Sequence, residues 1–551
     1  MPPTADCEKT PLSVYKNKYK KENKQIFCGE NQCMQIISSH QRHQLEFGCL
    51  EDKIAQDNPV RFIEAFVEHI ELEKLGFQAR ATKQEGRPGF DAKLFLKIYF
   101  YGYLNGIRSS RRLAKECCRN IELQWLCVQL QPNYHSICDF RKDNSTALRN
   151  TFKLFVSFLK DEQLVSGATI AIDGTKVRAH NSKKQNFSAK KLERHIAYIE
   201  TKTNEYLTAL AENDLQEDAI KVSDVAQKIE RLKTNKIYYE HLQEELAESG
   251  DTQISVTDAD ARALLVQGQV VEVAYNVQAA VDDKHNLVVA THTINKNDRN
   301  ALSAIAKESK ANLQVETYTA LVDKGYHNGH QIEQCQQANI TTIVAAPEVV
   351  NSNEYGTTEA YVVTKFRYDK TTDTYTCPQG ETLTTKGTWH KKTRERDSYQ
   401  FKKYRTPKCK VCAVKHLCTG RQKGGREIER SQYAEAVEIN NRNYKNNAAL
   451  YRKRQEINEH IFGTIKRKWG YYYTDLKGLE KVNGEYSLIM LVYNMKRCFK
   501  LLGIENLIAK IKNWQPEYPQ PTLFAAILAL IEEICAMIYF SHKSQAIKRV
   551  A

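Results

Sequence analysis

The sequence lacks a run of apolar residues long enough to cross a membrane, which argues against an integral membrane protein. The most apolar candidate, residues 523–540, is interrupted by Glu532 and Glu533, and we interpret it as a packing helix. The N-terminus also lacks the basic and then apolar segment of a secretory signal. Fifteen cysteines, an odd number, favour free thiols or a metal site in a reducing compartment over a disulfide framework. We therefore expect a cytoplasmic protein without a membrane partner.

Acidic residues are in deficit. The chain has 66 Asp and Glu against 81 Lys and Arg, which gives a net charge of +15 and a pI near 9.0. Such a surplus favours a polyanionic partner, and nucleic acid is the usual one. At 551 residues the chain is long enough for two to four domains with sizeable cores.

Two aspartates follow short apolar runs. Residues 166–182 read SGATIAIDGTKVRAHNS, in which the run 169–172 predicts a buried strand that places Asp173 at or just past its end. A second run, 319–322, is followed by Asp323. A lone aspartate after a strand is also typical of an ordinary turn. A third acid, Glu459, lies in a basic segment with helical periodicity, and three such carboxylates suit a site that holds two divalent cations about 4 Å apart.

The order of the predicted elements defines a fold class. After residue 161 we expect a strand, a β-hairpin, and then alternating helices and strands, which indicates a mixed α/β sheet covered by helices on both faces. Ribonuclease H-like nucleases and transposases share this order. The expected parts are a polar extension (1–57), an all-α, DNA-binding domain (58–160), the sheet domain (161–349 and 440–505) with a helical-hairpin insertion (187–249), a cysteine-rich insertion (350–439) and a C-terminal helical segment (506–551).

Candidates for duplex contacts in the all-α domain are five basic residues: Arg108, Arg111, Arg112, Arg141 and Lys142. The alternative is that this domain is a solvated helical bundle that braces the next domain.

The cysteine-rich insertion contains a CPQG turn and a CKVC turn. Together with one later cysteine they supply four thiolates, the number that a closed tetrahedral zinc site needs: Cys377, Cys409, Cys412 and Cys418. We expect a zinc-ribbon-like module with one structural Zn²⁺, although His416 is a possible substitute ligand. Free cysteines in a loop-rich insertion are the alternative. The surrounding segment is basic, which favours phosphate contacts over a merely solvated surface.

Residues 446–469 predict one basic helix. Arg452, Glu459 and Lys466 are seven residues apart, so a regular helix would place all three on one face. We expect residues 461–462 to dock on the sheet while Glu459 meets the two aspartates. Lys466 and Arg467 are then candidates for gripping DNA phosphates, and the alternative is that these charges only solvate the helix.

Five stretches carry a family resemblance: IDGTKVRAHNS, VTDADARAL, AYNVQAAVDDKHNLVV, VDKGYHNG and NEHIFGTIKRKWGYYYTDLKG. They resemble the DDE transposases of bacterial insertion sequences over about residues 58–500, and most closely the branch with a helical N-terminal domain and a cysteine-rich insertion. The resemblance implies a ribonuclease H-like domain, DNA cleavage with Mg²⁺ or Mn²⁺, and strand transfer at element ends. It also implies a nucleoid-associated homodimer on double-stranded DNA, with the terminal inverted repeats and the target as substrates.

The resemblance places the DDE set on Asp173, Asp323 and Glu459. The helix signature of the family has a Tyr, an Arg, the Glu and a Lys at fixed intervals, and Glu459 and Lys466 fit it. Tyr451 and Arg454 are one residue out of register, so Arg454, like Arg452, is carried only as a DNA-binding candidate. Two alternatives are a metal-dependent nuclease that cuts without joining and a non-catalytic DNA-binding remnant of a transposase.

Overall fold

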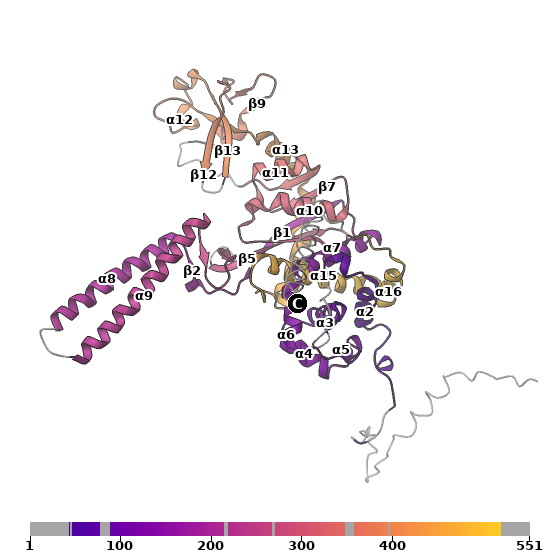
Figure 1. Cartoon of the computed structure of the whole chain (residues 1–551). Coiled ribbons are helices and arrows are strands. Elements are labelled where there is room, and N and C mark those ends of the chain that lie inside the picture. Colours follow the sequence, from indigo (N-terminus) through magenta and orange to yellow (C-terminus); the bar gives the residue numbers. More distant parts are fainter. Residues whose placement is uncertain are drawn as a thin grey trace, which may run out of the picture. The chain divides into compact units, whose positions relative to one another are not determined.

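The computed structural model describes residues 43, 47–77, 89–213, 219–266, 270–347, 357–394 and 397–518 (Figure 1). By its internal contacts the chain divides into residues 1–55 and 56–551. The described part of the first unit forms one 3₁₀ turn, Glu51–Lys53. Residues 523–540, and most of the expected C-terminal helical segment, lie outside the described residues. None of the described helices combines the length and apolar character needed to cross a bilayer.

A six-stranded mixed sheet forms the centre of the second unit. Its strands are β1 (Thr169–Arg178), β4 (Arg262–Val266), β5 (Val270–Asp282), β6 (Leu287–Ile294), β7 (Tyr318–Val322) and β8 (Ile340–Val344). The order across the sheet is β6-β5-β1-β7-β8, and β4 pairs with the first half of β5. Strands β1, β7 and β8 run parallel, whereas β5 is antiparallel to β1. This arrangement confirms the predicted mixed sheet and its hairpin, and adds β4, which the sequence pattern did not predict.

Helices cover both faces and both edges of this sheet. The helices that contact it include α10 (Leu302–Leu313), α11 (Gly329–Gln337), α13 (Ala434–Asn446), α14 (Ala448–Phe462) and α15 (Leu479–Leu502), whereas α16 (Ile504–Asn513) packs against α15. Asn494 of α15 bonds both the N–H and the carbonyl of Val288 on β6, and Asn440 of α13 does the same to Val344 on β8. An open strand edge can pair with another chain, and each of these amides occupies the N–H and the carbonyl of one residue on an edge strand.

The all-α domain confirms the predicted helical pattern. Its helices are α2 (Pro59–His69), α3 (Ala92–Leu104), α4 (Ser110–Arg119), α5 (Ile121–Leu126), α6 (Tyr134–Asp143) and α7 (Ser145–Asp161). Asn58 caps α2 by accepting from the Val60 N–H, as expected of Asn-Pro at a helix start.

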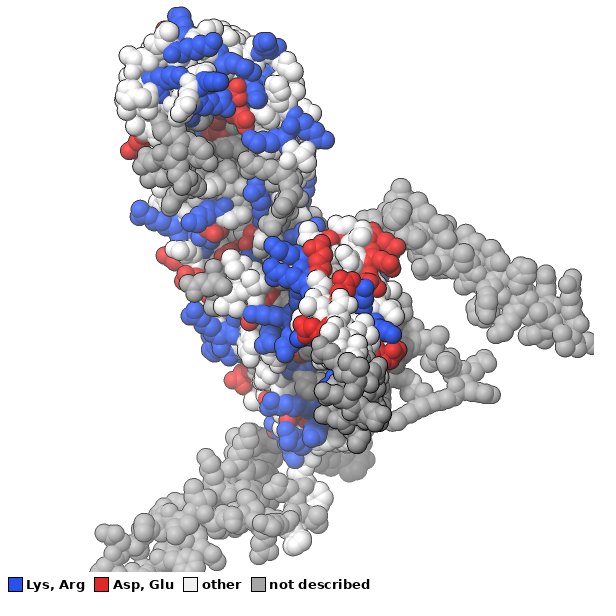
Figure 2. Space-filling model, turned by 90° about the vertical axis from the view of Figure 1, so that its left-hand side faces the viewer, with Lys and Arg blue, Asp and Glu red and all other residues white. Residues whose placement is uncertain are grey.

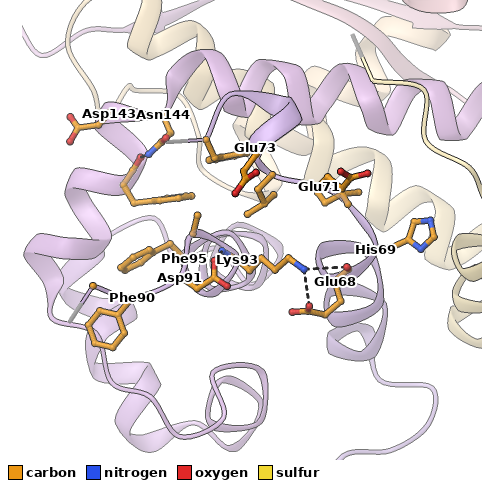
Figure 3. Close-up of a pocket in the computed structure, with 16 residues that line it drawn as sticks. Glu68, His69, Glu71, Glu73, Phe90, Asp91, Lys93, Phe95, Asp143 and Asn144 are labelled. Carbon is orange, nitrogen blue, oxygen red and sulfur yellow. Dashed lines mark hydrogen bonds and ion pairs between the residues drawn. The ribbon is translucent and has the colours of Figure 1, made fainter. Parts of the chain in front are cut away.

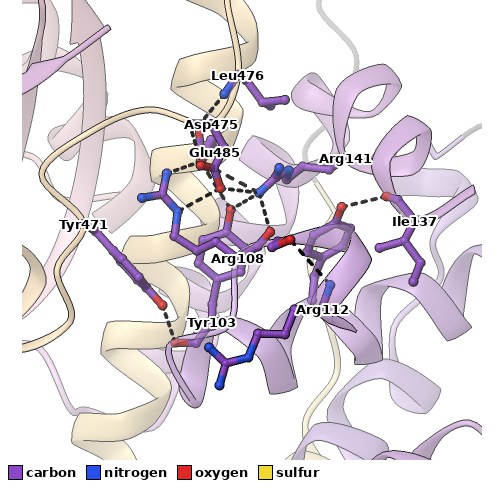
Figure 4. Close-up of polar contacts among 11 residues, drawn as sticks. Tyr103, Arg108, Arg112, Ile137, Arg141, Tyr471, Asp475, Leu476 and Glu485 are labelled. Atoms are coloured by element: carbon purple, nitrogen blue, oxygen red, sulfur yellow. Dashed lines mark hydrogen bonds and ion pairs between the residues drawn. The ribbon is translucent and has the colours of Figure 1, made fainter. Parts of the chain in front are cut away.

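Two of the five basic residues proposed for duplex contacts in this domain are buried. Arg108 and Arg141 form ion pairs with Glu485 of α15 and with Asp475 (Figure 4). They therefore join the all-α domain to the sheet domain and are not available to DNA. Arg111 and Arg112 of α4 are exposed.

Two insertions interrupt the sheet domain. The first contains the helical hairpin α8 (Ala189–Asn213) and α9 (Ala219–Ser249), flanked by β2 (Asn186–Phe187) and β3 (Ile254–Ser255), which confirms the predicted pair of helices. The predicted break at residues 214–218 lies outside the described residues. The second is a small β module followed by a helical turn. Its elements are β9 (Arg367–Asp369), β10 (Thr374–Thr376), β11 (Thr382–Thr385), β12 (His390–Arg394), β13 (Asp397–Arg405), α12 (Lys415–Cys418) and β14 (Ile428–Ser431).

Candidate active site

Asp173 and Asp323 lie at equivalent points of two neighbouring parallel strands. Ile172 on β1 pairs with Val322 on β7, and each aspartate is the next residue in its chain. Neighbouring strands are about 4.8 Å apart, so the register alone brings the two carboxylates close. Asp323 directly follows β7, as predicted. The prediction for Asp173 was wrong in detail, because β1 continues five residues beyond it to Arg178.

Strand β1 continues because residues after Asp173 have partners on a distant segment. Residues 173–178 pair with β5, and the Arg178 N–H donates to the Tyr472 carbonyl at 2.9 Å. The Thr474 N–H in turn donates to the Arg178 carbonyl at 2.9 Å. Asp173 therefore lies within a hydrogen-bonded β-strand, and not in a turn.

Arg454 of α14 connects the two aspartates. One guanidinium nitrogen lies 3.7 Å from Asp173 Oδ2, and the other lies 3.2 Å from Asp323 Oδ1. The Arg454 side chain is only 11% exposed, which keeps the planar fork in one orientation. Both carboxylates thus face one shared cation. The sequence marked Arg454 as a DNA-binding candidate and gave no sign of this contact.

The electrostatic setting of Asp173 suits a site that binds cations. Burial raises the pKa of Asp173 to about 6, although the Gly174 N–H bond and the Arg454 charge act in the opposite direction. The nearby carboxylates of Asp323 and Asp298 add to the rise in this pKa. A positive charge placed between these acids would relieve the penalty of ionising them.

Glu459 does not join this pair. It is exposed on α14, and no hydrogen bond or ion pair connects it to Asp173 or Asp323 in the described chain. The residue before it, Asn458, is 2% exposed, and neither polar atom of its side chain has a partner. Across the described residues, no group of three or more His, Cys, Asp or Glu side chains is arranged to hold a metal ion. The three-acid site therefore stays a prediction.

The helix that carries Glu459 changes its geometry after Phe462. Residues Gly463–Lys468 form a π-helical turn, in which the hydrogen bonds span five residues, so Lys466 does not keep the seven-residue relation to Glu459. The Lys466 ammonium turns to β1 and donates to Thr175 Oγ1 and to the Lys176 carbonyl, both at 3.0 Å. Burial, followed by the charge of Lys176, lowers the Lys466 pKa. Arg452 and Arg467 remain exposed, as DNA contacts require.

Asp298 is a neighbouring residue that the sequence analysis missed. It opens the 3₁₀ turn Asp298–Asn300 (η4) between β6 and α10, and Lys176 Nζ donates to its Oδ2 at 2.7 Å. The only sequence signal is the Asn297-Asp298 pair between a predicted strand and a predicted helix, which is also an ordinary helix start.

The cysteine-rich module brings the four predicted cysteines into one region. Cys377 and Cys418 pack against a small core that includes Tyr404 and Ile428. The Glu381 N–H donates to Cys377 Sγ at 3.3 Å. Burial raises the pKa of Cys409 and of Cys418, and the charges of the other cysteines contribute to both rises. Figure 2 shows Lys and Arg side chains gathered at the top of the molecule, where Figure 1 places this module.

A pocket of about 690 Å³ lies elsewhere, in the all-α domain (Figure 3). It is lined by residues such as Glu68, Lys93 and Asp143, and Lys93 is paired with Glu68 at 2.9 Å. None of the three predicted acids lines it, so it contributes nothing to the candidate active site.

Comparison with family models gives two matches. Residues 48–143 match a model described as a transposase domain (DUF772), and residues 376–499 match one described as a transposase DDE domain. Together the two matches support a transposase function and a DDE transposase of an insertion sequence. Glu459 lies inside the second match, whereas Asp173 and Asp323 lie between the two. Searches of curated proteins and of solved structures find no match.

Proposed function

We propose that Asp173 and Asp323 hold a divalent cation, Mg²⁺ or Mn²⁺, for phosphodiester cleavage at the element ends and for strand transfer into target DNA. The observation that carries this proposal is the shared contact with Arg454, because two carboxylates on adjacent strands already face one positive group. Mg²⁺ is commonly held by one or two carboxylates together with substrate phosphates, so this pair of oxygen donors fits the ion. The cation supplies charge stabilisation at the reacting phosphate.

The sheet topology supports a ribonuclease H-like assignment of the catalytic domain. Across the sheet, β6, β5 and β1 are antiparallel neighbours, and β7 and β8 continue the sheet parallel to β1. Asp173 lies on β1 and Asp323 directly follows β7. Helix α14 then crosses beside β1 and β7. We assign Glu459 as the third acid. Its helix already contacts both aspartates through Arg454, which lies five residues earlier on α14.

Arg454 has a defined role in this proposal. While its guanidinium lies between the carboxylates it balances their charge. With a cation held by these carboxylates, Arg454 would be available to bind a non-bridging oxygen of the DNA phosphate, a group that guanidinium recognises well.

The decisive experiment compares four single variants with the wild type on linear DNA that carries the element ends. Asp173→Asn, Asp323→Asn and Glu459→Gln should abolish cleavage and keep DNA binding within a few fold, because metal ligands contribute to chemistry more than to phosphate contacts. Glu456→Gln is the matched control, since Glu456 is also exposed on α14 and should cleave like the wild type.

The products distinguish the alternatives. Cleaved and joined DNA supports the transposase, and cleaved DNA that is never joined supports a stand-alone nuclease. DNA binding without cleavage at any Mg²⁺ or Mn²⁺ concentration supports a non-catalytic remnant. If Glu459→Gln cleaves normally and Glu456→Gln does not, the third acid is Glu456. We further propose that the protein acts as a homodimer on the inverted repeats. Mass measurement of the DNA complex by light scattering tests this.

For the cysteine-rich module we propose one structural Zn²⁺ bound by Cys377, Cys409, Cys412 and Cys418. Two features support it: the other three cysteines lie near enough to Cys418 to raise the pKa of its thiol, and the Glu381 N–H already donates to a sulfur. Gly425 lies so close that a Cβ there would be 2.3 Å from Cys409 Cβ, so the loop is closed tightly around this cysteine. Metal analysis of the purified protein should find one zinc per chain, and its absence would leave four free thiols.

A further inference from the structure

Asp298 is the centre of a half-buried polar cluster beside the two aspartates, in which Asn276 and Gln278 are fully buried. Its Oδ2 accepts from Lys176 Nζ at 2.7 Å, and its Oδ1 accepts from Asn276 Nδ2 at 2.7 Å and from Gln278 Nε2 at 3.0 Å. Burial by itself would raise the pKa of Asp298, but Lys176 and the amide donors outweigh it and lower this pKa. The carboxylate therefore bonds donors from two strands, β1 and β5.

The cluster lies directly behind the backbone of Asp173. Side chains alternate along a strand, so Gly174 and Lys176 belong to the face of β1 opposite Asp173. A Cβ at Gly174 would lie 2.3 Å from Gln278 Nε2, 2.6 Å from Asp298 Oδ1 and 2.8 Å from Asn276 Oδ1. No side chain fits at position 174 unless the cluster moves. The cluster therefore contacts the strand at the residue that follows Asp173.

The same cluster reaches the loop that carries Asp323. Gln278 Oε1 accepts a hydrogen bond from the hydroxyl of Tyr326, which is 1% exposed and lies three residues after Asp323. A Cβ at Gly325 would lie 3.9 Å from Asp323 Oδ2 and 4.0 Å from Asp298 Oδ2. These two carboxylate oxygens are therefore no more than about 8 Å apart.

We propose that Asp298 is a positioning residue of the active site, which fixes the spacing of Asp173 and Asp323 by bonding β1 and β5 and, through Gln278 and Tyr326, the Asp323 loop. It is not itself assigned as a metal ligand, because three donors already occupy its oxygens. Residues that orient metal ligands from behind typically change metal affinity or activity about 10–100-fold when replaced. This inference rests on the proposed metal-dependent function and adds a residue that neither family model contains.

The test uses the full chain and compares Asp298→Asn with Asp282→Asn. Asp282 is a matched control: it is 0% exposed, lies on the same strand system at the end of β5, and accepts from the N–H groups of Ser166 and Gly167. Both variants lose one carboxylate that accepts several hydrogen bonds, so both should lower the unfolding temperature without metal. Only Asp298→Asn disturbs the spacing of the metal-binding pair.

Two readouts separate positioning from plain stability. The first is the rise in unfolding temperature with increasing Mn²⁺ in the absence of DNA. The second is cleavage, recorded as kcat and as the Mn²⁺ concentration that gives half the maximal rate. Asp298→Asn should raise that concentration about 10-fold or more and lower kcat, with DNA affinity unchanged within a few fold. Asp282→Asn should keep the Mn²⁺ dependence of the wild type.

A milder variant guards against misfolding of Asp298→Asn. Tyr326→Phe removes only the hydroxyl that joins the cluster to the Asp323 loop, and it should shift the Mn²⁺ dependence in the same direction by a smaller factor. The inference is overturned if Tyr326→Phe and every folded Asp298→Asn sample require the same Mn²⁺ as the wild type. A wild type that neither cleaves nor gains stability with Mn²⁺ instead refutes the proposed metal-dependent function, so the two failures are distinguishable.

Discussion

The buried ion cluster between the all-α domain and α15 gives a quantitative prediction. Glu485 is 0% exposed, and its carboxylate is paired with Arg108 at 2.5 Å and lies 3.9 Å from Arg141 (Figure 4). The same carboxylate accepts from the N–H groups of Asp475 and Leu476 at 3.1–3.2 Å. Two guanidinium groups are thus balanced by two carboxylates, Glu485 and Asp475, within one desolvated space.

Replacing Glu485 by Gln keeps the shape of the side chain and removes one of these negative charges. Two buried guanidinium groups then share only Asp475, and breaking a buried pair in this way costs about 3–5 kcal/mol. Burial alone would raise the pKa of Glu485, but Arg108 and Arg141 outweigh it and lower this pKa below its ordinary value of 4.5. The stabilisation is therefore present above pH 4.5 and is lost as the pH falls through the lower folded-state value.

Urea unfolding followed by circular dichroism at pH 7.5 measures this loss directly. Glu200→Gln is the control. Glu200 is 54% exposed and pairs with Lys236 on the helical hairpin, so its loss should cost less than about 1 kcal/mol. Replacing both Arg108 and Glu485 by Met should recover much of the lost stability, because the remaining charges, Arg141 and Asp475, still pair with each other. A Glu485→Gln protein within about 1 kcal/mol of the wild type would refute the reasoning.

Three further predictions concern Asp173, the π-helical turn after α14 and the cysteines. Asp173→Asn should raise the unfolding temperature of the metal-free protein at pH 7.5, because burial raises the Asp173 pKa to about 6, and the gain should vanish below about pH 4, where the carboxyl group is protonated in both states. Arg467→Ala should lower the slope of log affinity against log salt by about 0.9, whereas Lys466→Ala should mainly lower stability, because its ammonium is bonded to β1. Cys412→Ser, or chelation, should make the cysteine-rich module sensitive to protease while the central sheet stays resistant; equal sensitivity with and without chelator would argue against zinc.

Much of the sheet was predictable because its strands are short apolar runs bounded by turns. The β5–β6 hairpin, β7 and β8 all follow this rule, and Asp323 was correctly placed directly after β7. The second half of β1 was not predictable, since GTKVR alternates without a clear apolar face and is held by β5 and by residues 472–474. Strand β4 was missed for a similar reason: it is a short edge strand that, among the described strands, pairs with β5 alone.

The polar contacts that organise the site were beyond sequence reasoning because they join distant residues. Arg108 and Arg141 carried the same local signal as any exposed arginine on a helix, and only the fold supplies the acids that bury them. Arg454 fell outside the expected helix register, yet it is the residue that contacts both aspartates. Asp298 resembles an ordinary residue at a helix start until β5 places two amide donors on its carboxylate.

The π-helical turn explains why a regular periodicity was a poor guide to the side chains of α14 and the residues that follow it. A seven-residue spacing keeps two side chains on one face only while each turn has the α-helical number of residues. Gly463–Lys468 departs from that number, so Lys466 turns inward to Thr175 while Glu459 stays exposed. Single π turns inside α-helices occur frequently at functional sites, where they set the direction of a side chain. The Lys466 ammonium thus attaches this turn to Thr175 and Lys176, two and three residues beyond Asp173 on β1.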